Sequence, residues 1–448
     1  MRGFRCGICQ SGLLVFFTLM VAVPIVHAQE KNNFYTIEKS VLEALANNWG
    51  VKTKRERIDE ASYVKEQAKA DFFPKFSTTY SYTRLDEAGQ SKPIPLGPGL
   101  TIPSRQTNTE DNYQWKSSVK QPLFTGFALL SAYELAKLGI DRSDMELELQ
   151  KLDLSLSVKE AYFNILKSDK AVDVVSKSVE SLESHVKTAS SFYDVGIIPV
   201  NDLLKAEVEL ANAQQNLVKA QHASRLGRHA FNTTLARSVD LPVEVEDILT
   251  YKPEAVDLEE ALNKALKQRP DMKVLDISIL QADQQIRLAK SKYYPEAALT
   301  YDYIKEGDQF DVSGDEFHDA HRWQAMAVLS WTFWEWGKTA NAVREKGSLK
   351  KQLMLTRSSL VDNISLEIRK AALELELTEK NIPTTKKAVE QAEENLRVSE
   401  ERYKAQVTTS TEVLDAQTQL TQARINYYGA LYDHHVAKAR LQRAVGEN

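Results

Sequence analysis

Two acidic residues near the end of the chain, Glu412 and Asp415, have a spacing that suits ion binding. Three positions apart on a helix, they lie on one face. If several copies meet around an axis, such a pair forms two stacked rings of carboxylates that attract cations. The spacing alone favours the commoner arrangement, in which both are solvated on the outer face of a helix. Whether Glu412 and Asp415 face an axis or the solvent therefore depends on the elements that carry them.

A second group has the residue types of metal ligands: Asp315, Glu316, His318, Asp319 and His321. It lies in a polar stretch, 305–322, that is typical of a long exposed loop, so an ordinary solvated loop is the favoured interpretation. For His434-His435, late in the last predicted helix, we expect a structural role or plain exposure. The sequence has no Gly-rich phosphate loop, no nucleophile elbow and no pair of catalytic carboxylates in a pocket-like context. We therefore predict no enzyme activity, no cofactor and no metal site.

The elements that carry these residues occur twice. Residues 113–238 align with residues 323–448 without a gap, at a constant offset of 210 positions. The match is best at one turn, where Tyr193, Leu204, Ala206, Leu210, Ala213 and Asn216 correspond to Tyr403, Leu414, Ala416, Leu420, Ala423 and Asn426. The segments before each hairpin align at an offset of 221. A period this long indicates a duplicated subdomain rather than a solenoid unit. Each half is predicted to contain a helix, a strand, a loop, a strand and two long helices.

The first 28 residues have the pattern of a secretory signal peptide, because Arg2 and Arg5 precede an apolar stretch that ends in Val26-His27-Ala28. The expected parts of the chain are this signal peptide (1–28), a first repeat (29–238), an inter-repeat linker (239–257) and a second repeat (258–448). Cleavage would remove both cysteines and shift the formal net charge from −5 to −7. Such mild acidity gives no electrostatic footprint for nucleic acid.

Four segments alternate with period two and have aromatic residues near their ends, at 76–82, 113–120, 299–303 and 323–331. This pattern predicts strands. An ordinary soluble sheet shows the same alternation, but four such strands of about 8 to 10 residues in a secreted chain match the length and aromatic girdle of a transmembrane β-barrel. The predicted membrane aromatic belt is Tyr80, Tyr82, Tyr113, Trp115, Tyr301, Tyr303, Trp323 and Trp331.

Four strands cannot close a barrel across a bilayer, because an open edge in lipid leaves backbone groups without hydrogen bonds. Twelve strands from three protomers would leave a lumen, since about eight only just accommodate side chains. The Pro-rich stretch 85–112 and the polar stretch 305–322 are then typical of long exposed loops on the outer face. No stretch after the signal peptide approaches the apolar length of a membrane helix.

The remaining sequence predicts long helices. Apolar residues keep three-or-four spacing from Val158 to Tyr193 and again from Leu203 to Ala220, and the second copy repeats the pattern. This is coiled-coil patterning. Helices of roughly 45 to 55 residues would reach about 70 to 80 Å, far beyond the dozen residues typical of a globular domain. Twelve such helices from a trimer can form a cylinder.

The ordered set of features resembles the TolC-like outer-membrane efflux proteins. It comprises the signal peptide, the duplication, the segment Gln121-Pro122-Leu123-Phe124-Thr125-Gly126, and the turn from Tyr193-Asp194-Val195-Gly196 to Asp202-Leu203-Leu204 and Ala206. The resemblance covers essentially the whole chain after the signal peptide. It implies an internally duplicated α+β membrane protein, a homotrimer in which four transmembrane β-strands per protomer form a shared 12-stranded barrel. A long antiparallel α-helical coiled-coil barrel continues it into the periplasm.

The resemblance also implies the function. Such a protein is the outer-membrane exit duct of a tripartite efflux or type I secretion system in a Gram-negative bacterium. It contacts outer-membrane lipid, a periplasmic adaptor protein and an inner-membrane pump or ABC exporter, and most of the chain lies in the periplasm. The alternative is a periplasmic coiled-coil adaptor or scaffold that bridges membranes without forming a pore. That alternative predicts the hairpins but no membrane strands.

In this family the helical turns form the periplasmic entrance. The resemblance assigns Glu412 and Asp415 to an inward acidic ring, and it favours the ring over solvated residues. It assigns entrance and adaptor-docking positions to Tyr193, Gly196, Asp202, Leu203, Tyr403, Gln406 and Leu414. We expect Leu203, Leu204, Val413 and Leu414 to pack between helices, Gly196 to adopt positive φ, and Ser410 or Thr411 to cap the last helix. Relatives often carry a basic residue near Thr408 that latches the closed entrance, and this chain lacks it.

Overall fold

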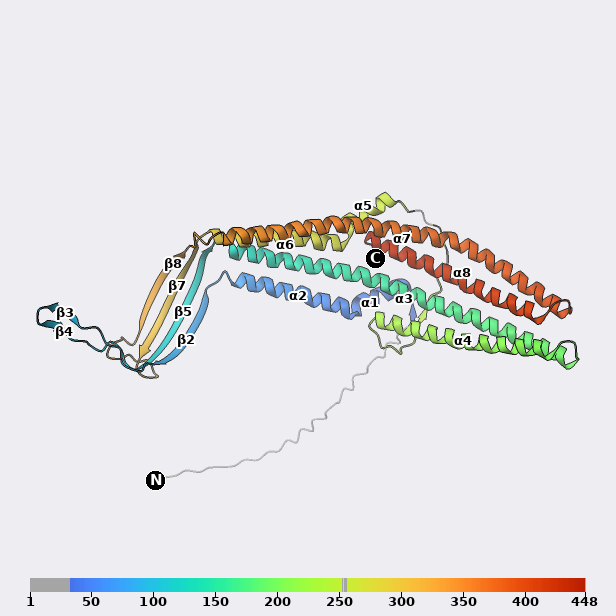
Figure 1. Cartoon of the computed structure of the whole chain (residues 1–448), viewed down its shortest axis with the longest axis horizontal. Helices are drawn as coiled ribbons and strands as arrows, with labels where there is room; N and C mark the ends of the chain where they lie inside the picture. The colour runs from blue at the N-terminus through green and yellow to red at the C-terminus, as the bar shows by residue number, and fades with distance from the viewer. Residues whose placement is uncertain (1–32, 252, 254–255, 448) are drawn as a thin grey trace, which may run out of the picture.

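The computed structural model describes residues 33–251, 253 and 256–447, so the expected signal peptide lies outside the described part. The molecule is elongated, with a β-sheet at one end and two helical hairpins whose turns lie together at the other (Figure 1). Its helices are α1 (Ile37–Asn47), α2 (Trp49–Ala70), α3 (Ala128–Asp194), α4 (Val200–Thr234), α5 (Leu258–Gln268), α6 (Pro270–Lys290), α7 (Lys338–Lys404) and α8 (Ser410–Val445).

The first helix of each half is broken in two, where the sequence pattern predicts one continuous helix. In the first half the break is Asn48, whose side chain accepts a hydrogen bond from the Gly50 backbone N–H and so starts α2. In the second half it is Arg269, at the equivalent position, whose ψ of 125° lies outside the helical region because Pro270 follows it. The two copies thus break the helix at the same position, the first with an asparagine cap and the second with a proline.

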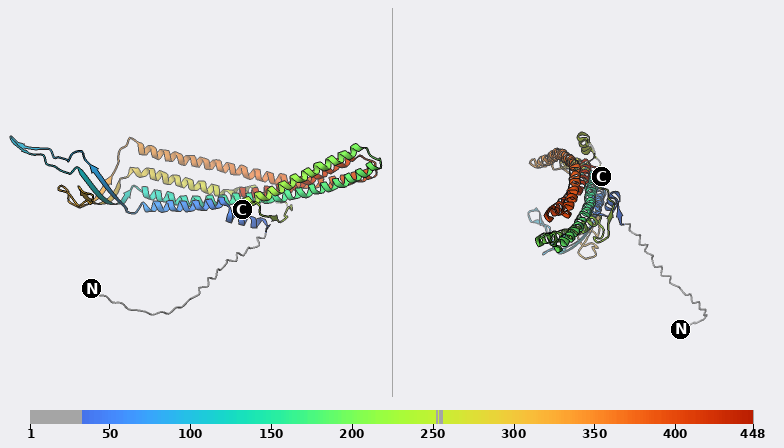
Figure 2. Two further views of the ribbon diagram at one scale, coloured as in Figure 1. Left: turned by 90° about the horizontal axis from the view of Figure 1, so that it is seen from below. Right: turned by 90° about the vertical axis from the view of Figure 1, so that its right-hand side faces the viewer.

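The predicted length of roughly 45 to 55 residues is wrong for each of the four long helices. Helices α3 and α7 each have 67 residues, which is about 100 Å at 1.5 Å per residue, whereas α4 has 35 and α8 has 36. Two shorter helices pack along each long one. Helices α2 and α4 both pack on α3, and α6 and α8 both pack on α7. Seen end-on, the helices lie along an arc (Figure 2). Within the described residues, no helix combines the length and apolarity needed to cross a membrane.

The predicted strands form one antiparallel sheet in the order β2 (Lys75–Arg84), β5 (Asp111–Thr125), β7 (Glu296–Gly307) and β8 (Arg322–Ser330). The central pair, β5 and β7, joins the two halves of the duplication. The stretch 85–112, expected as a polar loop, instead contains a hairpin of β3 (Ile94–Gly97) and β4 (Leu100–Ile102) that projects beyond the sheet (Figure 1). Its Ile and Leu residues alternate with Pro, Thr and Gly, a short strand signal that the prolines obscure.

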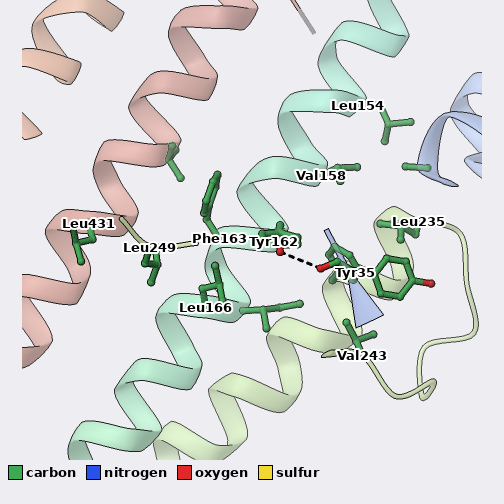
Figure 3. Close-up of a cluster of buried hydrophobic side chains, with 14 of the residues drawn as sticks. Tyr35, Leu154, Val158, Tyr162, Phe163, Leu166, Leu235, Val243, Leu249 and Leu431 are labelled. Atoms are coloured by element: carbon green, nitrogen blue, oxygen red, sulfur yellow. Dashed lines mark hydrogen bonds between the residues drawn. The ribbon is translucent and has the colours of Figure 1, made fainter. Parts of the chain in front are cut away.

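The largest buried cluster lies midway along the helices, where the inter-repeat segment packs back on the first half. Strand β6 (Glu244–Val245) pairs in parallel with β1 (Phe34–Tyr35). The Tyr162 hydroxyl donates to the backbone carbonyls of Tyr35 and Glu246 at 3.1 and 2.9 Å, and burial raises the pKa of Tyr162 to about 12 (Figure 3). Because the Tyr162 hydroxyl bonds to Tyr35 in β1 and to Glu246 directly after β6, it fixes this segment against α3.

Candidate functional site

The two faces of the sheet differ in chemistry. Residues opposite one another in the register share a face. One face carries the expected aromatic residues with Leu299, Ala325, Ala327 and Leu329, and the other carries a network of charges. On that polar face Asp302 accepts hydrogen bonds from Ser118 at 2.6 Å and Gln324 at 2.9 Å and pairs with Lys116 at 3.0 Å. Such a difference between the two faces is typical of the sheet in a transmembrane β-barrel.

Seven of the eight predicted belt residues gather toward the loop end of the sheet. Tyr82 stacks on Tyr113 with ring centroids 4.7 Å apart, and Tyr301 stacks on Trp323 at 6.1 Å. Trp331 differs, since it follows the last residue of β8 and donates its indole N–H to the Tyr293 carbonyl at the helix end. The pattern therefore grouped residues from both ends of the strands into one belt.

The two helical turns share one backbone geometry. Gly196 has φ 74° as expected, and Gln406, which replaces that glycine in the second copy, has φ 63°. The expected capping of α8 is wrong: Thr409 occupies the N-cap position without a side-chain hydrogen bond, and the Ser410 hydroxyl bonds elsewhere. The second turn thus retains a strained residue at the position where the first has glycine.

Replacing Gln406 by glycine is expected to stabilise the chain by about 1 kcal/mol, because glycine adopts the left-handed region without strain. The matched reverse change, Gly196→Gln, is expected to destabilise it by a similar amount, since an added Cβ meets nothing within 4 Å and backbone strain acts alone. The check is the free energy of unfolding in denaturant. Shifts of the same sign for both variants would contradict the argument.

Equivalent residues near the turns differ in burial. Tyr403 is 4% exposed and packs against His185 and Phe192 of α3, whereas its counterpart Tyr193 is 42% exposed. Leu414 is buried as expected, but the expectation for Leu204 is wrong, since it is exposed, and Leu203 is only half-buried. The side chains near the turn are therefore buried within the chain at the second hairpin, whereas their counterparts at the first hairpin are exposed or half-buried.

The two acidic candidates have different surroundings. Glu412 pairs with Arg402 at 2.7 Å and accepts a hydrogen bond from the Thr408 hydroxyl, so both partners come from its own hairpin. Asp415, one turn later, is exposed. In the first hairpin, Asp202 lies 3.9 Å from Lys205. Sequence reasoning missed Arg402, which closes the second turn although the chain lacks a basic residue near Thr408.

The contact between the hairpins has a buried histidine at its centre. His185 of α3 hydrogen-bonds the Ser410 hydroxyl of α8 at 2.8 Å, and its ring packs on Tyr403. A groove of about 320 Å³ runs beside it, lined by residues of α3 and α7 that include Lys177, Glu180, Glu400 and Lys404. Burial lowers the pKa of His185 from its usual 6.5.

Acid is expected to weaken this contact. Because the folded chain holds the pKa of His185 below 6.5, the unfolded chain binds the proton first. The stabilisation is complete above pH 6.5 and falls by up to about 1 kcal/mol per pH unit below it. His185→Gln, which keeps a polar partner for Ser410, should lose less stability than wild type between pH 7.5 and 5.5. Equal losses in denaturant titrations would show that His185 does not carry the effect.

The metal-type cluster proves to be a structured loop. The Asp315 carboxylate, nearly buried, accepts from the backbone N–H groups of Phe317 and His318 and lies 3.0 Å from the His318 ring. In the described part of the chain, no group of three or more His, Cys, Asp or Glu residues is placed to hold a metal ion. His434 is buried and His435 stacks on Phe163 at 4.7 Å, which is a structural role.

Known proteins share this arrangement. A family model described as outer membrane efflux protein matches residues 41–226 and 261–447. The chain is 24% identical over 301 residues to the cobalt-zinc-cadmium resistance protein CzcC of Cupriavidus metallidurans, which covers 66% of this chain and 68% of that protein. It is 24% identical over 324 residues to outer membrane protein TolC of Escherichia coli, covering 68% of this chain and 63%, just under two thirds, of TolC. The solved CmeC outer membrane channel of Campylobacter jejuni has the same fold, with a TM-score of 0.75, 16% identity, and coverage of 92% of this chain and 85% of that one.

Proposed function

The chain belongs to the outer membrane efflux protein family, and from this we propose how three copies of it build a continuous duct. The protein acts as an outer-membrane exit duct for efflux or type I secretion. Because the family consists of outer-membrane channels, its match favours an exit duct over a periplasmic scaffold without a pore. The duct itself performs no chemistry.

The observation that carries the proposal is the two-faced sheet. Within the described residues, β2 and β8 are its edge strands. Edge strands cannot stay open in lipid. Three sheets joined edge to edge give twelve transmembrane strands, with the aromatic face toward outer-membrane lipid and the Asp302 network toward a water-filled lumen.

The helices support the same assembly. Exposed leucines form one stripe along α7 at Leu355, Leu366, Leu373 and Leu377. The counterparts of the last two in α3, Phe163 and Lys167, pack on His435 and Tyr432 of α8. By the offset of the duplication, Leu373 and Leu377 would pack on positions 225 and 222 of α4 in a second copy. Exposed Leu226 lies beside them. Repeated three times, this contact closes a helical barrel in the periplasm.

The helical turns form the proposed periplasmic entrance. Exposed Tyr193, with Gly196, Asp202 and Leu203, and Gln406 of the second turn, present the docking surface for a periplasmic adaptor. Tyr403 and Leu414 are buried and hold the shape of that turn. The adaptor links the duct to an inner-membrane pump or ABC exporter. The proposed parts of the chain remain a signal peptide (1–28), two repeats (29–238 and 258–448) and a linker between them.

The entrance carries the proposed acidic ring. Asp415 forms the ring directly, and Glu412 joins it when the Arg402 pair opens. The groove between α3 and α7, which also lies at the hairpin ends, is proposed to contact the adaptor, so that docking affects the ring geometry through Tyr403 and Ser410.

Single-channel conductance in a planar bilayer tests both the duct and the ring. Purified trimers are expected to insert and conduct, and Glu412→Ala with Asp415→Ala should reduce cation preference and divalent-cation block several-fold. The matched control is Glu401→Ala, an exposed acid on the same hairpin paired with Lys404. Conductance with no change in the double variant would remove the ring and keep the duct. Failure to insert would contradict the duct.

A further inference from the structure

Two lysines face each other across neighbouring strands of the sheet. Lys75 of β2 lies directly opposite Lys120 of β5, and both side chains are exposed. Because alternate residues of a strand share a face, Lys120 lies on the same face as Lys116, which is the polar face that carries the Asp302 network. Like charges directly opposite one another destabilise an antiparallel pair. The sheet therefore gains no stability from this pair of lysines.

The polar face has one positive charge in excess. Most of its charges cancel within ion pairs, since Lys116 contacts Asp302 at 3.0 Å and Arg322 contacts Glu306 at 2.9 Å. In the described part of the chain, Lys120 forms no ion pair. The charged residues on this face of the four strands are the cations Lys75, Lys116, Lys120 and Arg322 and the anions Glu296, Asp302 and Glu306.

The second repeat has the same pair of positions without the excess charge. Its counterparts of Lys75 and Lys120 are Glu296 and Ser330, which also lie directly opposite each other. In each copy the first member of the pair is neutralised by an ion pair with the residue four positions earlier, at 2.7 Å in the first copy and 2.9 Å in the second. Because a serine suffices at the position equivalent to Lys120, strand pairing does not require the lysine.

The place of Lys120 in the proposed barrel gives its charge a consequence, because three copies bring three ammonium groups to the wall of one lumen. We propose that Lys120 forms a basic ring in the lumen of the barrel, which concentrates anions there and makes the outer-membrane part of the duct favour anionic cargo. A ring of charged side chains on a pore wall selects ions by the sign of their charge. The proposal rests on the membrane crossing proposed above, since it takes the polar face to line the lumen.

The basic ring acts independently of the proposed acidic ring. The sheet and the helical turns lie at opposite ends of α3, whose 67 residues span about 100 Å at 1.5 Å per residue. Charges in water are screened beyond about 10 Å at roughly 0.1 M salt. A substitution at Lys120 therefore changes the anion preference of the barrel without acting on Glu412 or Asp415.

Reversal potentials of trimers in a planar bilayer, under a gradient of KCl, test the proposal. At about 0.1 M salt, Lys120→Gln is expected to lower the permeability of chloride relative to potassium about twofold. Ser330→Lys adds a cation at the equivalent position of the second copy and should raise the same ratio, and it decides alone if Lys120→Gln fails to assemble. Potassium glutamate in place of KCl extends the measurement to an organic anion. At about 1 M salt, where the screening length falls to about 3 Å, both shifts should vanish.

The matched control is Lys305→Gln, which removes a lysine from the other face of the same sheet and should leave the ratio unchanged. Trimers that conduct with an unchanged ratio in both Lys120→Gln and Ser330→Lys overturn the basic ring and keep the duct. An equal shift for Lys305→Gln also overturns the ring, because the charge then acts from either face. Wild-type trimers that fail to insert contradict the duct and the ring with it.

Discussion

Replacing Arg269 by alanine is expected to lower the free energy of unfolding by about 3 kcal/mol. The Arg269 side chain is 4% exposed, forms two hydrogen bonds to Asp271, and donates to Glu367 of α7 and to the Ala444 carbonyl at the end of α8. Its loss leaves the carboxylate of Asp271 and a buried carbonyl without their partner. The effect lies at the low end for a broken buried ion pair, because Asp271 and Glu367 are partly exposed and Glu367 keeps Arg443.

The dependence on pH identifies the cause. Burial would raise the pKa of Asp271, but hydrogen bonds and the charge of Arg269 hold it below the usual 3.8. The pair therefore stabilises the fold above pH 3.8, and this stabilisation is lost as pH falls through the lower folded value. The cost of Arg269→Ala in denaturant titrations should shrink correspondingly in acid.

The matched control is Arg357→Ala, which removes an exposed pair with Asp276 on the same two helices, α6 and α7. Its expected cost is below about 1 kcal/mol. Equal costs for the two arginines would mean that the buried network around Arg269 does not tie the three helices together.

If the sheet crosses the membrane as proposed, arginine in place of Ala327 is expected to destabilise folding into phospholipid vesicles by about 2–4 kcal/mol, the cost of a charge at the lipid-facing midplane of a barrel. Ala327 lies midway between Trp323 and Trp331 on the aromatic face, opposite Leu299. The measurement is the free energy of folding into vesicles by denaturant titration, with recovery of trimers from the outer-membrane fraction as a second readout.

The control for this substitution is its neighbour in the same strand. Met326 lies opposite Thr300 on the other face, and Met326→Arg should be tolerated because it places the charge in the lumen. If Met326→Arg is as damaging as Ala327→Arg, the two faces have been assigned wrongly. If both are tolerated, the sheet does not cross a membrane.

The alternation of the strands and the three-or-four spacing of the helices are local patterns, so the sequence predicts them directly. The duplication adds the two hairpins, because a constant offset repeats the same elements, whereas the order of the strands in the sheet comes from the structure. Gly196 illustrates the point: its positive φ follows from a turn that only glycine adopts without strain, and the structure confirms it. Gln406 has the same positive φ although glutamine disfavours it, because the surrounding hairpin imposes that conformation.

The sequence by itself determined which elements form and that they occur twice, since backbone propensity and periodicity act within about one turn or one strand. Only the tertiary structure decided which of two equivalent residues is buried. Tyr403 is covered by α3 of the same chain, whereas its counterpart Tyr193 remains exposed. It also decided that Arg402 pairs with Glu412. These arrangements depend on contacts between residues far apart in the chain, which no local pattern encodes.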